Sequence, residues 1–143
     1  MITSGTVVLA HDASAKLQTG FTKIGRVTIG KRVFVGAGAV ILPGSTIGDD
    51  SIVGALTVVR GEVPPGSVVI GNPATIVSDV ESFSEKHRVA ATQAPVWPHA
   101  GWASGQGITE SHKQVQREAL AGGVSGYLRG GSAAQAAQPG DSR

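Results

Sequence analysis

A chain of 143 residues is long enough for one ordinary domain, or for a small domain and a tail. Its formal charge of +2 is weak and its Lys and Arg residues are scattered, which argues against a nucleic-acid-binding surface, and the lack of cysteine excludes disulfides, thiolate metal sites and cysteine nucleophiles. With 21 glycines, 4% aromatic residues and no apolar run near the roughly 18 residues that span a bilayer, the composition favours a soluble protein with a core of small aliphatic side chains.

The first stretch, residues 2 to 10, is predicted to form a strand because it is rich in Thr, Val, Ile and Leu. His11 and Asp12 open a segment that interrupts this pattern. From residue 13 to 23 no hydrophobic period is visible, and polar residues predominate. This segment is therefore predicted to be a polar loop.

A six-residue period organises the chain from Ile24 to Val59. This period fits neither an α-helix nor a plain two-residue alternation. Each hexad can supply a short strand with one aliphatic side chain pointing inward and a turn where glycine relieves the backbone, and three such strands make a triangular coil. Stacked coils then bury a continuous column that no single coil could bury alone. The predicted inward residues are Ile29, Val35, Ile41, Ile47, Val53 and Val59.

The repeat is predicted to end shortly after Val59. Pro64 and Pro65 cannot donate to a ladder, so they are expected to terminate the regular wall. Residues 67 to 70 are then predicted to form a last strand, and the Gly-Asn-Pro-Ala sequence at 71–74 a turn that closes the repeat.

The remainder of the chain predicts an extension with short helices. One weakly amphipathic helix is expected over residues 79 to 91, and a second from an N-cap at Thr109 to about Leu120. From Gly130 onward the composition cannot bury enough surface to order itself, so disorder is predicted. The expected organisation is a repeat domain, an extension and a disordered tail, over residues 1–77, 78–129 and 130–143.

Several motifs follow one another as they do in the hexapeptide-repeat acyltransferases: Gly-Arg-Val-Thr-Ile-Gly (25–30), Phe-Val-Gly-Ala-Gly-Ala-Val-Ile-Leu-Pro-Gly (34–44), Thr-Ile-Gly-Asp-Asp (46–50), Ile-Val-Gly-Ala (52–55), Val-Pro-Pro-Gly (63–66) and Gly-Asn-Pro-Ala (71–74). Within that superfamily, residues 4 to 77 most resemble the galactoside, maltose and polysaccharide O-acetyltransferases. The resemblance implies an all-β fold, a short left-handed parallel β-helix followed by a partly helical C-terminal tail. It also implies a homotrimer that binds acetyl-CoA between neighbouring subunits, without a metal, in the cytoplasm where acetyl-CoA is made.

Relatives commonly carry further coils before the polar loop, and these are missing or nearly missing here. The chain is therefore either a minimal or truncated version, or starts at an internal methionine.

His11 is the candidate catalytic base. Acetyl transfer to a hydroxyl needs a base that removes the hydroxyl proton, and imidazole suits this task near neutral pH. In the acetyltransferases that the chain resembles, a histidine at this place does so directly, without an acyl-enzyme. Asp12 is a second candidate, although adjacent side chains of an extended strand point to opposite faces, and a turn-forming aspartate is the simpler interpretation.

Two glycine-alanine pairs are the candidate contacts for the long arm of CoA. Gly36-Ala37 and Gly54-Ala55 lie eighteen residues apart, so they are expected at the same corner of successive coils. Small residues there would let the arm approach the main chain, and a backbone N–H could hold the reaction's oxyanion. The resemblance implies that Ala37 and Ala55 supply these contacts.

The resemblance also assigns Arg60 and Thr75 to the cofactor site. A guanidinium at Arg60 would suit the phosphates of CoA. Thr75 stands where many relatives have a basic residue, which weakens the grip on the nucleotide or moves it to Lys31, Arg32 or the tail.

The sequence thus favours an enzyme that acetylates a hydroxyl of a sugar or polysaccharide precursor. An amino-sugar N-acetyltransferase and a catalytically incomplete β-helix with a structural role remain alternatives. A hexapeptide-repeat carbonic anhydrase is disfavoured, because its zinc needs three histidines per site and only His11 lies within the coils. Acceptor choice, for a small molecule or a glycan, is expected to lie in the loop at 12–23 and in the tail.

Overall fold

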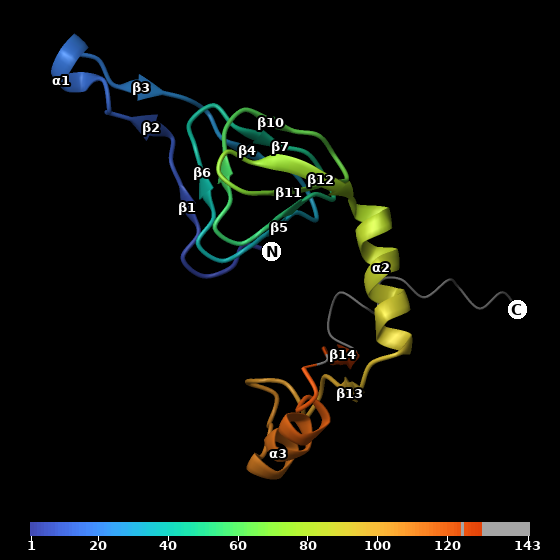
Figure 1. Ribbon diagram of the computed structural model, residues 1–143. Helices are drawn as coiled ribbons and strands as arrows, with labels where there is room; N and C mark the ends of the chain where they lie inside the picture. The colour runs from blue at the N-terminus through green and yellow to red at the C-terminus, as the bar shows by residue number, and fades with distance from the viewer. Residues whose placement is uncertain (124, 130–143) are drawn as a thin grey trace, which may run out of the picture. The chain divides into compact units, whose positions relative to one another are not determined.

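The computed structural model describes residues 1–123 and 125–129, and the tail predicted to be disordered, residues 130–143, lies outside them. The chain divides into two compact units, of which the first is Met1–Glu85 and the second starts at Lys86. In the first unit short strands wind around a common axis, whereas the second combines helices with a pair of short strands (Figure 1).

Two-residue strands carry the six-residue period through the first unit. In each strand the second residue is the one predicted to point inward, so the predicted repeat is confirmed. The strands are β4 (Thr28–Ile29), β5 (Phe34–Val35), β6 (Val40–Ile41), β7 (Thr46–Ile47), β8 (Ile52–Val53) and β9 (Val58–Val59).

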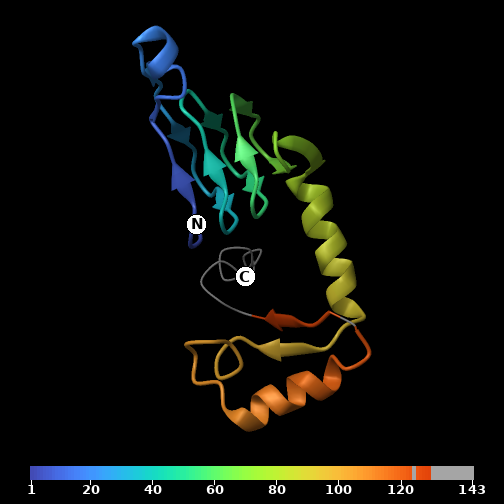
Figure 2. The same cartoon turned by 60° about the vertical axis from the view of Figure 1, so that its left-hand side comes forward.

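The strands stack in parallel with a register of eighteen residues. Val35 lies opposite Val53 in β5 and β8, and Ile41 lies opposite Val59 in β6 and β9. β4 and β7 pair in the same way on a separate sheet. Every third hexad therefore returns to the same wall, and the walls stack coil upon coil (Figure 2).

A column of aliphatic side chains fills the inside of the coils. The inward residues from Val35 to Val59 are buried, while Ile29 is partly buried against them. The positions two residues earlier also point inward, and the hydroxyls of Ser45 and Ser51 there donate to backbone carbonyls of the next coil. Polar side chains thus enter the core only where a neighbouring coil supplies a partner.

The N-terminal residues form part of a first coil. Residues 2–10, predicted as a strand, contain an isolated bridge at Ile2, a turn and a two-residue strand. Strand β1 (Val7–Val8) pairs in parallel with β6, and Val8 lies opposite Ile41. These two residues are 33 positions apart instead of 18, so fifteen residues are inserted into the repeat.

Fourteen of these residues, 11–24, project from the coils as an arm (Figure 1). A polar loop is predicted over residues 13–23, whereas the arm contains an antiparallel pair and one short helix. These are β2 (His11–Asp12), α1 (Lys16–Thr19) and β3 (Lys23–Ile24). Leu17 is 94% exposed and Phe21 77% exposed, so the arm has an apolar surface that its own chain leaves uncovered in the described residues.

The prediction that two prolines end the wall is wrong. β10 (Glu62–Val63) pairs in parallel with β7, and β11 (Ser67–Ile70) pairs in parallel with β8. Val63 is buried opposite Ile47, sixteen residues away instead of eighteen. Pro64 and Pro65 occupy the turn between β10 and β11, where no ladder N–H is needed, so the coil shortens without ending.

After the turn at residues 71–74 the chain reverses. Strand β12 (Thr75–Asp79) runs antiparallel to β11, the predicted last strand of the repeat. Helix α2 (Val80–Thr92) follows directly and agrees with the helix predicted over 79–91.

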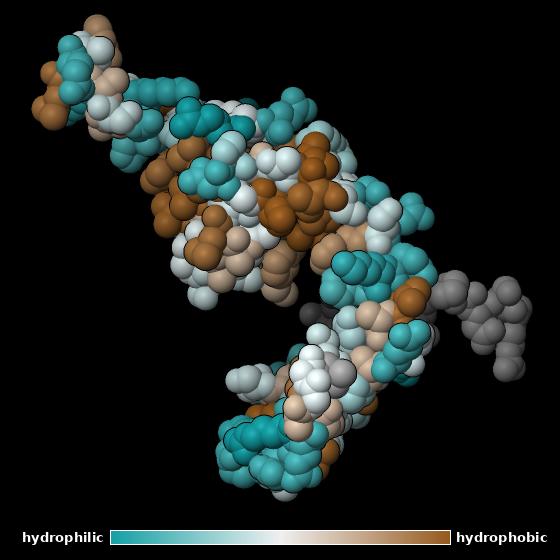
Figure 3. Space-filling model, viewed as in Figure 1, coloured by the Kyte–Doolittle hydropathy of each residue, from teal (hydrophilic) through white to brown (hydrophobic). Residues whose placement is uncertain are grey.

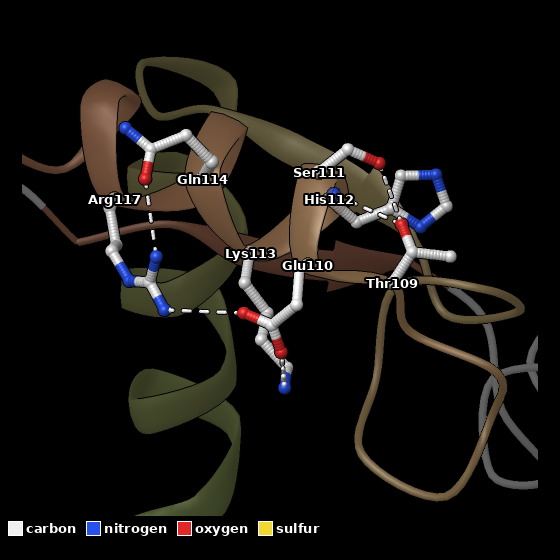
Figure 4. A network of polar contacts seen from close by, with 7 residues as sticks. All are labelled: Thr109, Glu110, Ser111, His112, Lys113, Gln114 and Arg117. Carbon is white, nitrogen blue, oxygen red and sulfur yellow. Dashed lines mark hydrogen bonds and ion pairs between the residues drawn. The ribbon is translucent and has the colours of Figure 1, made fainter.

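The second unit contains a parallel strand pair and a capped helix. β13 (Val96–Pro98) pairs with β14 (Tyr127–Arg129). Thr109 caps α3 (Glu110–Ala119) as predicted, and its hydroxyl accepts the backbone N–H of His112. On the surface of α3, Glu110 lies within ion-pair distance of Lys113 and Arg117 (Figure 4).

Aromatic rings form a stack inside the second unit. The centroids of Trp97 and Trp102 are 6.1 Å apart, and those of Trp102 and His112 are 4.3 Å apart, with nearly parallel planes. Among the described helices, none has the length and hydropathy needed to cross a membrane.

The burial pattern of the coils predicts that substitutions at neighbouring residues of one strand differ greatly in their effect on the free energy of unfolding. Ile47 is buried between Ile29 and Val63, whereas Thr46 points outward. We expect Ile47→Ala to lower the free energy of unfolding by about 2–5 kcal/mol because it leaves a cavity. Thr46→Ala is the control and should change it by less than about 0.5 kcal/mol, measured by denaturant unfolding. Equal losses for both variants would contradict the inward register.

Candidate functional site

His11 lies at the base of the arm. It pairs with Ile24 in the β2–β3 ladder, and its side chain is exposed. Its ring has no hydrogen-bond partner among the described residues. The imidazole is therefore accessible from solvent, and no carboxylate in the described part of the chain holds it.

Asp12 forms a local turn. Its carboxylate accepts the backbone N–H of Ser14 at 2.8 Å, and this hydrogen bond is the main reason why the pKa of Asp12 is lowered. A hydrogen bond from the Ser14 side chain lowers this pKa as well, burial opposes the shift, and the positive charges of Lys23 and Arg60 lower it further. The contact is the one expected of a turn-forming aspartate, and it does not orient His11.

Arg60 shares a corner of the coils with the base of the arm. The backbone N–H of Leu9 donates to Ile41, and that of Leu42 donates to Val59, so the residues that follow β1, β6 and β9 lie above one another. Arg60 follows β9, is exposed, and is close enough to Asp12 for its charge to lower that pKa. His11, Asp12 and Arg60 therefore belong to one edge of the sheet β1-β6-β9, called here the arm corner.

The glycine-alanine pairs stack at the other edge of the same sheet, called here the alanine corner. The backbone N–H of Leu56 donates to the carbonyl of Ala37 at 2.9 Å, which joins the two coils there. A Cβ added at Gly36 would lie 2.7 Å from the carbonyl carbon of Gly54. Gly36 thus permits the close approach of two coils, in agreement with the predicted stacking of the pairs.

Two backbone N–H groups at the alanine corner are available to a ligand. The N–H groups of Gly36 and Gly54 donate to Val53 and Val69 in the coil stack, so they are already engaged. Ala37 and Ala55 are exposed, and their N–H groups have no acceptor in residues 1–123 and 125–129. Of the four predicted contact residues, the two alanines are the ones that can donate to a bound molecule.

The predicted nucleotide contacts are spread over different corners. Thr75 begins β12 and is exposed, just after Ala74, whose N–H donates to Val58 above the alanine corner. Arg32 lies at a third corner, where its guanidinium forms a two-point ion pair with the carboxylate of Asp50. This pair raises the pKa of Arg32 and lowers that of Asp50. Arg60 is the better placed cation, because Arg32 is already paired.

The two corners are well separated within one chain. Ala55 and Arg60 are separated by the left-handed turn residue Leu56 and by strand β9. The extended steps from Thr57 to Arg60 alone cover roughly 10 Å. One chain therefore does not place His11 beside the N–H groups of Ala37 and Ala55.

Sequence analysis missed one unusual residue at the alanine corner. Leu56 has a left-handed backbone with φ of 58° and is 76% exposed. A signal was present, because Gly38, eighteen residues earlier, is the residue type that this conformation favours. Elsewhere, the described residues contain no cluster of three or more His, Asp or Glu side chains that could hold a metal.

Comparison with known proteins identifies the repeat. The sequence model of the family described as bacterial transferase hexapeptide (six repeats) matches residues 26–61. The resemblance to the hexapeptide-repeat acyltransferases is thus confirmed, and the chain carries the repeat of these bacterial transferases.

Individual relatives match this chain over only part of their own length. A protein of Bacillus subtilis (strain 168) named "Putative acetyltransferase YvoF" is 40% identical over 86 residues, which are 60% of this chain and 48% of that protein. The galactoside O-acetyltransferase of Escherichia coli (strain K12) is 39% identical over 61 residues, 43% of this chain and 30% of that protein. The match therefore spans at most about half of these two relatives.

A solved structure with a similar repeat is the hexapeptide-repeat-containing acetyltransferase VCA0836 from Vibrio cholerae O1 biovar eltor, complexed with acetyl coenzyme A. It has 30% sequence identity and a TM-score of 0.48, and the match covers 55% of this chain and 49% of that chain.

The hydrogen bond that Asp12 accepts in its turn predicts a lowered pKa, which a titration can measure. Because its folded pKa is lowered, we expect the carboxyl to titrate below the value of about 3.9 that is typical of an unfolded aspartate. The contact then stabilises the arm fully above about pH 4, and this stabilisation is lost as the pH falls through the folded pKa. Ser14→Ala removes the side-chain hydrogen bond but keeps the backbone donor, which is the largest cause, so the pKa should stay lowered but by less. An NMR titration that gave a midpoint at or above 3.9 would contradict this assignment.

Proposed function

We propose that this protein is an acetyltransferase that moves the acetyl group of acetyl-CoA to a hydroxyl of a sugar or polysaccharide precursor. The observation that carries the proposal is the pair of exposed, unengaged N–H groups of Ala37 and Ala55 at one corner of stacked coils. The similarity to a galactoside O-acetyltransferase supports the choice of a hydroxyl acceptor.

The residues fit the chemical groups of the donor. Pantetheine contains amide carbonyls, which can accept hydrogen bonds from the N–H groups of Ala37 and Ala55 along the corner. The exposed guanidinium of Arg60 can pair with phosphates. Thr75 offers a hydroxyl near the end of the alanine corner, as a weaker substitute for a basic side chain.

His11 supplies the proton chemistry of a direct transfer. Its imidazole removes the proton of the acceptor hydroxyl while the oxygen attacks the thioester carbonyl. A backbone N–H of the alanine corner stabilises the negative charge on the carbonyl oxygen. When the carbon–sulfur bond breaks, the imidazolium returns its proton to the departing thiolate, so the products are an acetyl ester and free CoA.

The separation of the two corners requires a second copy of the chain. His11 of one copy would face the alanine corner of the next copy, and the resemblance implies a closed homotrimer. Two outer faces of the coils support this arrangement because they are apolar. Val7, Val40 and Val58 are aligned on one face, and Phe34 and Ile52 on the next, whereas the third face carries Thr28, Thr46 and Glu62. Figure 3 shows apolar side chains on the surface of this unit.

The arm gives the second copy a further contact. Its exposed Leu17 and Phe21 would lose contact with water if they packed on a neighbouring coil. We place the reaction in the cytoplasm, where acetyl-CoA is made, and assign the coils the left-handed winding that the resemblance implies.

A histidine substitution tests the function. Wild type should release free thiol from acetyl-CoA in the presence of a hydroxyl acceptor from a panel of sugars, and His11→Ala should be slower by about 100- to 10,000-fold. His11→Ala should still bind CoA, because the alanine corner is intact. His99→Ala removes a histidine outside the coils and serves as the control with unchanged activity.

The same panel should include amino sugars. Transfer to amines alone would overturn the assignment to O-acetylation while leaving acetyl transfer in place. If wild type bound CoA but released no thiol with any acceptor, the catalytic proposal would be wrong.

A further inference from the structure

Leu56 adopts a backbone conformation that is costly for its residue type. Its φ of 58° lies in the left-handed region, which a bulky side chain rarely occupies because its Cβ crowds the backbone. The equivalent residue of the previous coil is Gly38 with φ of 69°, and that of the first coil is Gly5 with φ of 73°. The repeat therefore needs a left-handed residue here, and it does not need a leucine.

The leucine gains little from its own chain. Its side chain is 76% exposed and lies over Gly38, where an added Cβ would be 2.7 Å from Leu56 Cδ2. Backbone strain of this kind persists when the surroundings demand it, and it is concentrated at binding and catalytic sites. An exposed apolar side chain in a strained position points to a contact outside the described chain.

The position of Leu56 indicates what it contacts. The residue follows Ala55 directly, and its N–H donates to the carbonyl of Ala37, so its side chain lies along the corner that carries the two unengaged N–H groups. An apolar face of a second copy pressed onto this corner would bury those N–H groups without acceptors, which is unfavourable. A ligand with both carbonyl groups and apolar groups satisfies the leucine and the N–H groups together.

We infer that Leu56 is a binding residue that packs against the pantetheine arm of acyl-CoA. The methylene and geminal methyl groups of the arm cover the leucine, while the arm's amide carbonyls accept from the N–H groups of Ala37 and Ala55. This inference rests on the proposed function. It adds a side-chain contact that is specific to the arm and independent of the nucleotide.

The test compares CoA with adenosine 3′,5′-bisphosphate, which carries the nucleotide end without the arm. Titration calorimetry on the full chain should show that Leu56→Gly binds CoA about tenfold more weakly, since it loses the burial of one aliphatic side chain. Its affinity for the bisphosphate should be unchanged. Its melting temperature should not fall, because glycine tolerates the left-handed backbone.

Thr46→Ala is the control. Thr46 is exposed on the outer face of β7, away from the alanine corner. It should bind both ligands as wild type does. Sedimentation velocity should give the same mass for all three proteins.

Each other outcome overturns the inference. Equal weakening for CoA and the bisphosphate, or a change of mass in Leu56→Gly, would assign the leucine to subunit contact or to general stability. Unchanged CoA affinity would show that the arm does not touch it. If wild type itself failed to bind CoA, the proposed function would fall, and the role of Leu56 with it.

Discussion

The structure depends on the eighteen-residue register between stacked coils. Each hydrogen bond from one coil to the next requires that equivalent residues return to the same wall, and the buried aliphatic column exists only while this register holds. The coils approach so closely that Gly36 has no room for a side chain beneath Gly54 and Ala55. In such a stack the interior has no space for a ligand. Chemistry is confined to the corners, to the outer faces and to insertions.

This constraint explains how the candidate site is divided. The alanine corner offers backbone N–H groups because its small side chains leave the main chain open, whereas the histidine enters through an arm inserted between β1 and β4. The register places these two features at opposite edges of one sheet. In the proposed function a single chain presents half of the site at each edge, and a ring of identical chains would bring unlike halves together. The apolar outer faces are suited to that assembly.

The sequence predicted the repeat because β-branched residues at every sixth position have few other structural explanations. It failed at Pro64 and Pro65, since the coil can close with sixteen residues instead of eighteen when a turn absorbs the prolines. The strand pair and short helix of the arm were not predicted, because its sequence has no hydrophobic period. The pairing of β2 with β3 depends on the coils, which hold the two ends of the arm side by side. The conformation of Leu56 was missed for a related reason: only comparison with Gly38 in the stacked coil reveals it.

The roles of the candidate residues stay predictions. His11 was chosen for its chemistry and from the family resemblance, and the alanines from motifs whose spacing matches the stack. Among the described residues, the N–H groups of Ala37 and Ala55 have no acceptor. The placement of Arg60 beside Asp12 follows from the fifteen-residue insertion, which no local pattern discloses.

If one active site draws on two copies of the chain, two inactive variants should restore activity when they are mixed. His11→Ala lacks the base, and Ala55→Trp blocks the alanine corner with a bulky exposed side chain. When both variants are refolded together in equal amounts, about a quarter of the interfaces in a random trimer combine an intact His11 with an intact Ala55. The account predicts recovery of about that fraction of wild-type acetyl transfer. Mixed oligomers that form but stay inactive would contradict it.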